Sequence, residues 1–361
     1  MTLTTNLFRS KIKRGVSLYC YQQADFFHKM TWKDQLREVA TGLNGATGVE
    51  IISETTIPNY PNPPESFIEE WNSEIARWGL TAVTMDTYID SLMFRDHVMT
   101  IGECAEKLKM DLKLAHKLGF QFLRPCTNLP LAAIASVLPL AEELGVTIAR
   151  EIHSPATIHP TRNVYGDVVA QAVAFIQTTG TKNYCLMPDM GIFQDRPSPV
   201  TIGYTLRGLG FNKEDSLKSA DEIFDASFEM DRDAFQIWLE KNYKDLTQTR
   251  IAGMFKNGNS TDPLELFSIF PYIKCLHGKF YNMTEIPGKP GQYEERSILY
   301  KEVINLLNDC LFDGYINSEF EGQRDQQDMG VEGLVDEVEQ VRRHHEMMQR
   351  LIDNDEYFIK V

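Results

Sequence analysis

Residues 146–153, VTIAREIH, form an apolar run that closes on two ionisable side chains. Such a run is typical of a buried strand, and alternate residues of a strand point to the same side. We therefore expect the side chains of Glu151 and His153 to face one space. Two ionisable groups in one space are costly unless something binds there, so this strand end is a candidate binding site.

Seven similar runs occur along the chain, and helical patterns separate them. The runs are residues 15–21, 48–52, 80–85, 120–125, 183–190, 272–280 and 314–321. The helical patterns include residues 31–43, 64–79, 101–119 and 129–145, several of which end in the glycine expected after a helix. Eight β-α units predict an α/β fold, a (β/α)8 TIM barrel, with one domain over residues 1–361.

The connection between the sixth and seventh runs is much longer than the others. Residues 195–265 contain a segment rich in proline and glycine, followed by two helical patterns. The insertion leaves the C-terminal end of a strand, where barrel active sites lie, so we expect a lid or a partner-docking surface. An extra helical hairpin without such a role is the alternative. The last helical pattern carries His344 and His345, which we expect to be solvated.

Composition limits the classes of function. The formal net charge of −15 disfavours a general nucleic-acid-binding role. The N-terminal residues lack the apolar core of a signal peptide, and no apolar run is long enough to span a membrane. The 6 cysteines are scattered without a paired motif. We therefore expect a cytoplasmic protein with free cysteines.

Four consecutive strands end in side chains suited to metal binding. Strand five provides Glu151 and His153, and the next three provide Asp189, His277 and Glu319. Clustered carboxylates repel one another unless a cation neutralises them. Three oxygen ligands and one imidazole suit a divalent metal, with Mn²⁺ preferred and Mg²⁺, Co²⁺ or Zn²⁺ possible. Its expected task is to polarise a carbonyl and to stabilise an enediolate.

Other polar or aromatic residues near the strand ends are candidates for substrate binding. Arg124, at the end of strand four, is a further polar group of the rim. The candidates for substrate binding are Lys279, Glu321, His159, Phe193 and Arg324. For Lys279, a plain salt bridge to Glu321 is an equal alternative, and His159 could instead be an ordinary loop residue.

The strand ends resemble the metal site of the xylose-isomerase-like barrels, the sugar isomerase/epimerase superfamily. Residues 262–283, DPLELFSIFPYIKCLHGKFYNM, look like its strand seven, and residues 314–322, GYINSEFEG, look like its strand eight. The resemblance implies that Glu151, Asp189, His277 and Glu319 are the metal ligands. Ketose 3-epimerases of this superfamily carry a histidine three residues after the strand-six aspartate, where this chain has Ile192.

A narrower resemblance is to the catalytic barrel subunit of bacterial C-glycoside deglycosidases. It rests on the Glu-x-His at residues 151–153, on GVSLYCYQ at residues 15–22 and on the long sixth connection. The resemblance implies a smaller β-sandwich partner subunit. It also implies cleavage of the carbon–carbon bond between a 3-oxo sugar and a phenolic or flavonoid aglycone. An isomerase or epimerase acting on a sugar or sugar phosphate is the alternative.

The candidate residues fit this chemistry. A C-glycosidic bond has no oxygen that a general acid can protonate, so the usual two-carboxylate mechanism fails. A ketone at C3 acidifies the C2 proton, and its removal allows the aglycone to leave from C1 by β-elimination. The reaction needs one base with a pKa near neutrality and one Lewis acid. We expect His153 to be the base and the metal to be the Lewis acid.

Overall fold

The computed structural model describes residues 10–126, 129–159, 166–257, 261–331 and 334–353. Its main sheet has eight parallel strands in the order β6-β5-β4-β3-β2-β1-β10-β7. Parallel bridges between Leu186 and Ile273 and between Asp189 and His277 join β6 to β7. The strands are β1 Lys13–Ser17, β2 Ala46–Ile52, β3 Thr81–Thr87, β4 Phe122–Pro125, β5 Thr147–Ile152, β6 Tyr184–Pro188, β7 Cys275–Phe280 and β10 Tyr315–Phe320.

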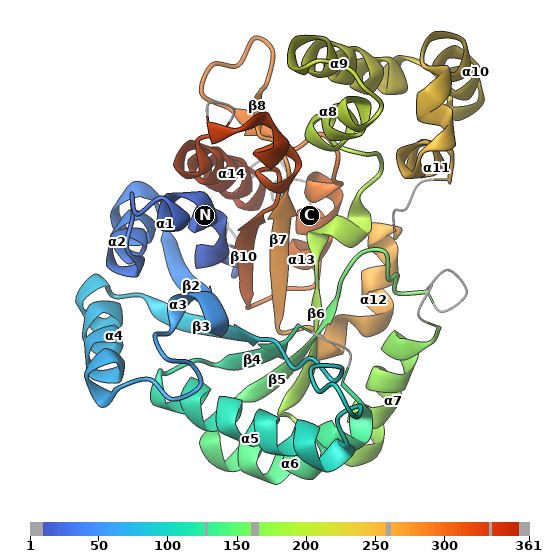
Figure 1. Ribbon diagram of the computed structural model, residues 1–361. Coiled ribbons are helices and arrows are strands. Elements are labelled where there is room, and N and C mark those ends of the chain that lie inside the picture. The colour runs from blue at the N-terminus through green and yellow to red at the C-terminus, as the bar shows by residue number, and fades with distance from the viewer. Residues whose placement is uncertain (1–9, 127–128, 160–165, 258–260, 332–333, 354–361) are drawn as a thin grey trace, which may run out of the picture.

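Helices surround this barrel, and each strand is followed by at least one (Figure 1). The surrounding helices are α2 Trp32–Gly42, α4 Glu65–Trp78, α5 Ile101–Lys117, α6 Leu131–Leu144, α7 Val168–Thr179, α12 Leu266–Ile269, α13 Tyr300–Asp309 and α14 Glu337–Ile352. Short helices α1 Gln22–Phe26 and α3 Ser53–Thr56 follow β1 and β2, and a small hairpin pairs β8 Thr284–Glu285 with β9 Tyr293–Glu294. The expected TIM barrel is confirmed.

Local sequence signals define the ends of several helices. Thr31 and Asp34 form a capping box at the start of α2, and Thr100 and Glu103 form another at the start of α5. These reciprocal bonds satisfy amide groups that the first turn of a helix leaves unpaired. At the other end, Gly145 follows α6 with a φ of 67°, a conformation that glycine adopts without steric cost.

The first strand is shorter than the sequence suggested. We expected a strand over residues 15–21, but β1 ends at Ser17 and a 3-10 helix, η1, covers Leu18–Tyr21. The chain then continues into α1. Apolar composition alone does not distinguish a strand from a buried turn of this kind. The turn brings Tyr19 to the mouth of the barrel, where it lines a pocket.

The long connection after β6 forms a group of four helices, α8 Pro199–Gly208, α9 Lys213–Glu229, α10 Arg232–Asn242 and α11 Arg250–Asn257. They have their own apolar core and lie together beside the barrel (Figure 1). Arg207 of α8 pairs with Asp328 at 2.7 Å. Thr201 donates to Asp325 at 2.7 Å. These bonds tie the insertion to η7, Arg324–Met329, which follows β10. That the insertion acts as a lid or as a partner-docking surface stays a prediction.

The histidines of α14 correct one expectation. His344 and His345 are 0% and 2% exposed, so they are not solvated. Both hydrogen-bond Ser318 Oγ at 2.9 Å. Their positions fall on the same helix face as Val341, Met348 and Ile352, which pack on the barrel. The spacing of these apolar residues decides which face of α14 is buried, and the two histidines are buried with that face although they are polar.

The cysteines agree with a further expectation. The 6 cysteines are free, and Cys20, Cys104, Cys185 and Cys275 are buried. Among the described residues, no helix has both the length and the apolar character that a membrane crossing requires.

Candidate active site

Four side chains converge at the C-terminal mouth of the barrel. Glu151 comes from β5, Asp189 follows β6, His277 lies in β7 and Glu319 in β10. Each offers one ligand atom, and these atoms lie within 4.8 Å of one another. Asp189 and His277 are fully buried, and the side chains of Glu151 and Glu319 are 9% exposed. The structure thus brings together all four residues that the sequence suggested as ligands.

Asp189 is held by the turn that follows β6. Its Oδ1 accepts a hydrogen bond of 2.6 Å from the backbone N–H of Gly191. A Cβ at Gly191 would lie 2.9 Å from that oxygen and 3.0 Å from Lys279 Cδ, so this close approach needs glycine. The bond occupies one carboxylate oxygen and leaves Oδ2 for the cluster.

His277 lies between carboxylates on both sides of its ring. Nδ1 is 2.7 Å from Glu151 Oε1 and 3.5 Å from Glu319 Oε2. Nε2 is 3.1 Å from Oε2 of Glu50, a fully buried residue of β2. A carboxylate behind a metal-binding histidine fixes the orientation and the tautomer of the ring. Glu50 is placed to hold Nδ1 of His277 towards the other three side chains.

Two buried cations partly balance these carboxylates. Arg124 of β4 lies 3.1 Å from Asp86 Oδ1, 3.5 Å from Glu151 Oε2 and 3.8 Å from Glu319 Oε1. Lys279 Nζ lies 2.7 Å from Asp189 Oδ2 and 3.4 Å from Glu319 Oε2. These five carboxyl groups, counting Glu50, face Arg124, Lys279 and His277, whose pKa the neighbouring carboxylates raise well above its usual value. Burial raises the pKa of Asp86 well above its usual range, so part of the negative charge is neutralised within the cluster.

The pKa values reflect this environment. Burial alone would raise the pKa of Glu319, but Lys279 and His277 lower it to about 2. Burial also acts to raise the pKa of Glu151, yet Arg124 and His277 hold it well below its usual range. For Asp189, burial prevails and the pKa is raised despite Lys279. Glu151 and Glu319 are therefore held in the ionised form, and a bound cation would shift Asp189 towards ionisation as well.

The side chains of the cluster are suited to binding a divalent metal ion. Asp189 Oδ2 and Glu319 Oε2 are buried, and neither accepts a hydrogen bond of good geometry from the described residues. Both oxygens face Lys279 Nζ, at 2.7 and 3.4 Å, so they have an ionic partner but no well-directed hydrogen-bond donor, and a cation would satisfy them more fully. Three carboxylates and an imidazole form a donor set for a hard or borderline divalent ion. The residues present fit such an ion.

His153 lies beside this cluster. Its Nδ1 is 2.6 Å from the carbonyl oxygen of Ser154, which can only accept, so Nδ1 carries the hydrogen. Nε2 of the neutral ring then holds the lone pair, and it lies 2.7 Å from Lys279 Nζ and 3.7 Å from Asp189 Oδ2. The His153 side chain is 48% exposed, which leaves its ring accessible from the mouth.

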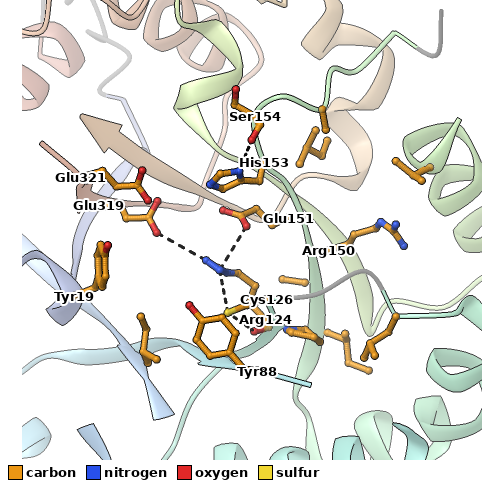
Figure 2. Close-up of a pocket in the computed structure, with 18 of the residues that line it drawn as sticks. Tyr19, Tyr88, Arg124, Cys126, Arg150, Glu151, His153, Ser154, Glu319 and Glu321 are labelled. Carbon is orange, nitrogen blue, oxygen red and sulfur yellow. Dashed lines mark hydrogen bonds and ion pairs between the residues drawn. The ribbon is translucent and has the colours of Figure 1, made fainter. Parts of the chain in front are cut away.

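A pocket of about 590 Å³ opens above these residues. Glu151, His153, Glu319 and Arg124 belong to its lining, and Figure 2 shows their side chains directed into one space. Tyr19 faces them from another side. The pocket is large enough for a sugar and is rich in charged groups, as polyhydroxylated ligands require.

Comparison with known proteins identifies relatives that match over almost the whole chain. The "3'-dehydrocarminate deglycosidase alpha subunit" of Microbacterium sp is 24% identical over 350 residues, which cover 93% of this chain and 94% of that protein. The "C-glycoside deglycosidase alpha subunit" of Arthrobacter globiformis is 24% identical over 355 residues, with 95% and 93% covered. The chain is a relative of these deglycosidase alpha subunits. It is accordingly an enzyme. No protein-family model matches the chain.

Solved structures agree with the fold of this chain. An L-ribulose 3-epimerase matches with a TM-score of 0.52 at 13% identity, covering 97% of each chain. A sugar phosphate isomerase/epimerase from Parabacteroides distasonis matches with a TM-score of 0.51 at 12% identity, covering 96% of each chain. Both structures agree with the barrel fold expected from the sequence.

The residues of this chain that we expect to bind the substrate fall into different places. Glu321 and Arg324 line the pocket and lie 3.2 Å apart. Lys279 is buried within the cluster, 3.4 Å from Glu321 Oε1. His159 is exposed and lies outside the pocket lining. Phe193 is 0% exposed and packs in the barrel core, so our expectation that it contacts the substrate is wrong. It ends the 3-10 turn that follows Asp189, and that turn folds inward.

Sequence reasoning missed Glu50 and Asp86. Glu50 sits within the run GVEII, and Asp86 directly follows the run that ends at residue 85. Together with His277 they form a second group whose atoms lie within 4.8 Å. The available signal was an acidic residue inside an apolar strand, a position that is rarely charged unless it is paired.

Proposed function

We propose that this chain is the barrel subunit of a metal-dependent enzyme that cleaves the carbon–carbon bond of 3-oxo-C-glycosides with phenolic or flavonoid aglycones. The observation that carries the proposal is the convergence on one pocket of Glu151, Asp189, His277 and Glu319 with the accessible ring of His153. The alpha-subunit relatives support it, because they match from end to end.

Glu151, Asp189, His277 and Glu319 would hold the cation, for which Mn²⁺ is our first choice and Mg²⁺, Co²⁺ or Zn²⁺ the alternatives. When bound, it would act as a Lewis acid beside the 3-keto group and so make the C2 proton more acidic. Glu50 would keep the His277 ring in the orientation that this requires.

His153 would remove the C2 proton. The hydrogen bond from Nδ1 to Ser154 leaves the Nε2 lone pair on the side of the acidic cluster. Lys279 shares that nitrogen, so its ammonium must turn towards Asp189 or Glu321 when the substrate approaches. Both carboxylates are already within 3.4 Å of Nζ. After proton removal, the electron pair forms a C1–C2 double bond as the C1–aryl bond breaks, and the aryl carbon takes up a proton.

A smaller β-sandwich subunit is the proposed partner. The printed names of the relatives call them alpha subunits, which implies at least one other subunit in those proteins. We propose the same arrangement here, in the cytoplasm.

An isomerase or epimerase of sugars is the second candidate function. The L-ribulose 3-epimerase structure shares the barrel fold with this chain, and that shared fold is its only support for an isomerase or epimerase function. The position that carries a histidine in ketose 3-epimerases is Ile192 here, and it is fully buried. No polar group at that position reaches a substrate.

The test is a cleavage assay on a 3-oxo-C-glycoside of a flavone, with Mn²⁺ or with EDTA, and with the partner co-expressed. We expect release of the free flavone with Mn²⁺ and none with EDTA. His153→Asn should lower kcat by about 10² to 10⁴, the range for loss of a general base, without changing Mn²⁺ affinity. His116→Asn, at an exposed position on α5, is the matched control. Isomerisation of plain ketoses without cleavage would overturn the proposal.

A further inference from the structure

A second cavity adjoins the charged pocket at the mouth of the barrel. Its volume is about 760 Å³, and it shares Tyr19, Gln22 and Tyr88 with the first pocket. Tyr19 and Tyr88 lie together on one side of the charged pocket (Figure 2). A ligand that fills the first pocket can therefore extend past these side chains into the second.

The second cavity differs in its chemistry. Its walls come largely from η1, α1 and the start of α2, and they include Leu18, Phe26, Phe27 and Trp32. The ring centroids of Phe26 and Phe27 are 5.2 Å apart in an edge-to-face arrangement. Phe26 remains 76% exposed, which leaves a large aromatic surface that the described residues do not cover. An exposed apolar surface beside a pocket marks a ligand or partner site.

We propose that the second cavity binds the hydroxylated aromatic aglycone of the substrate. The inference rests on the proposed function and extends it, because it assigns the sugar to the charged pocket and the aromatic ring to the apolar one. Ring faces pack on Phe26, Phe27 and Trp32, which line the cavity. The glycosidic carbon–carbon bond then lies near Tyr19 and Tyr88, where the two cavities meet.

Binding of a free trihydroxyflavone, measured by calorimetry on the full chain with its co-expressed partner, tests this inference. We expect Phe26→Ala and Phe27→Ala each to weaken flavone binding about tenfold, as loss of an aromatic contact does. The two side chains are 76% and 38% exposed, so neither change should lower the melting temperature appreciably. Phe267→Ala, at a 53% exposed position of α12, is the matched control and should bind the flavone as the wild type does.

The cleavage assay separates this inference from the proposed function. We expect kcat/KM to fall for a flavone 3-oxo-C-glycoside in both variants, but to stay near the wild-type value for a small phenyl 3-oxo-C-glycoside. If the wild type cleaves both substrates and the variants bind flavone and turn over both substrates normally, the inference is wrong and the proposed function stands. If the variants lose the partner subunit instead of the flavone, the cavity is a protein-docking site and the inference is likewise overturned. If the wild type cleaves neither substrate, the proposed function fails, and the inference with it.

Discussion

His277 and His344 lie on opposite sides of the same strand and show what burial alone does not reveal. Both are 0% exposed. His277 belongs to β7, within the carboxylate cluster. His344 of α14 lies against the outer side of that strand, where a Cβ at Gly278 would be 3.4 Å from its Cε1. Carboxylates, led by Glu50, raise the pKa of His277 well above its usual value, whereas burial lowers the pKa of His344 well below it.

The difference lies in the partners of the two rings. His344 bonds Ser318 Oγ at 2.9 Å and Tyr300 OH at 2.8 Å, and its ring stacks on Phe280 at a centroid distance of 4.1 Å. Neutral groups satisfy it completely. His277 is surrounded by ionised groups, two of which have oxygens without hydrogen bonds. A satisfied buried histidine supports the fold, and one among unsatisfied carboxylates marks a site.

The largest expected effect is a loss of Mn²⁺ affinity at the carboxylate cluster around His277, inside the barrel. Asp189→Asn keeps the shape of the side chain and its bond to Gly191 but removes one charged ligand. We expect Mn²⁺ affinity to fall by more than about 100-fold, beyond the range for outer-shell partners, and cleavage to fall with it. Calorimetric titration with Mn²⁺ measures the affinity. Unchanged Mn²⁺ binding would show that the cation binds elsewhere, for example between Glu50 and Asp86.

Lys279→Met tests the electrostatic balance of the cluster. The Lys279 ammonium is the nearest cation to Asp189 Oδ2, at 2.7 Å, so its removal leaves buried charges unpaired. We expect the metal-free variant to lose about 3–5 kcal/mol of unfolding free energy. Saturating Mn²⁺ should restore much of this loss, because a divalent cation then neutralises the same oxygens. Urea unfolding with Mn²⁺ and with EDTA measures both quantities. Equal stability of variant and wild type in EDTA would contradict the proposed balance.

A change at His344, outside the barrel, should lower the stability of the fold but leave Mn²⁺ binding intact. His344→Leu keeps the side-chain volume roughly constant but removes the bonds to Ser318 and Tyr300. We expect a loss of about 1–3 kcal/mol in unfolding free energy, since two buried hydroxyl groups each lose a partner. Mn²⁺ affinity should remain within about twofold of the wild type, because His344 touches no carboxylate of the cluster. A large loss of Mn²⁺ affinity would show that the two sides of β7 are coupled.

The comparison also explains what could be predicted from the sequence. All eight strands of the barrel could be predicted from apolar runs, and the convergence of Glu151, Asp189, His277 and Glu319 could be predicted because parallel strands end at one face. Glu50 could not be placed beside His277 in this way. The strands β2 and β7 are not neighbours in the sheet, and only the side chains that fill the barrel connect them.

Two other features depend on local geometry that apolar patterns do not encode. The second cavity exists because β1 ends at Ser17 and the chain turns into η1 and α1, where a longer strand was expected. The pairing of Lys279 with His153 depends on how both side chains extend from different strands. In contrast, the burial of His344 and His345 was predictable, because Val341, Met348 and Ile352 define that face of α14.

The smallest expected effect concerns stability in acid. Burial, with a contribution from Arg14, lowers the pKa of His345 to about 3. In the unfolded chain an ordinary histidine takes up a proton near pH 6.5, so the unfolded state gains protons before the folded state does. Stability is therefore lost as the pH falls from about 6.5 towards 3, by up to about 1.4 kcal/mol per pH unit for this one group.

His345→Gln should flatten this dependence while keeping a polar partner for Ser318 Oγ. Urea unfolding at several values between about pH 6.5 and 5 should show the gap between wild type and variant shrinking by about 2 kcal/mol as the pH falls. His97→Gln is the control, because Asp96 and Glu103 raise the pKa of His97, so its removal cannot flatten the slope. Equal slopes for wild type and His345→Gln would mean that His345 is protonated in the fold, and the outer face of the barrel would then also hold a charged histidine.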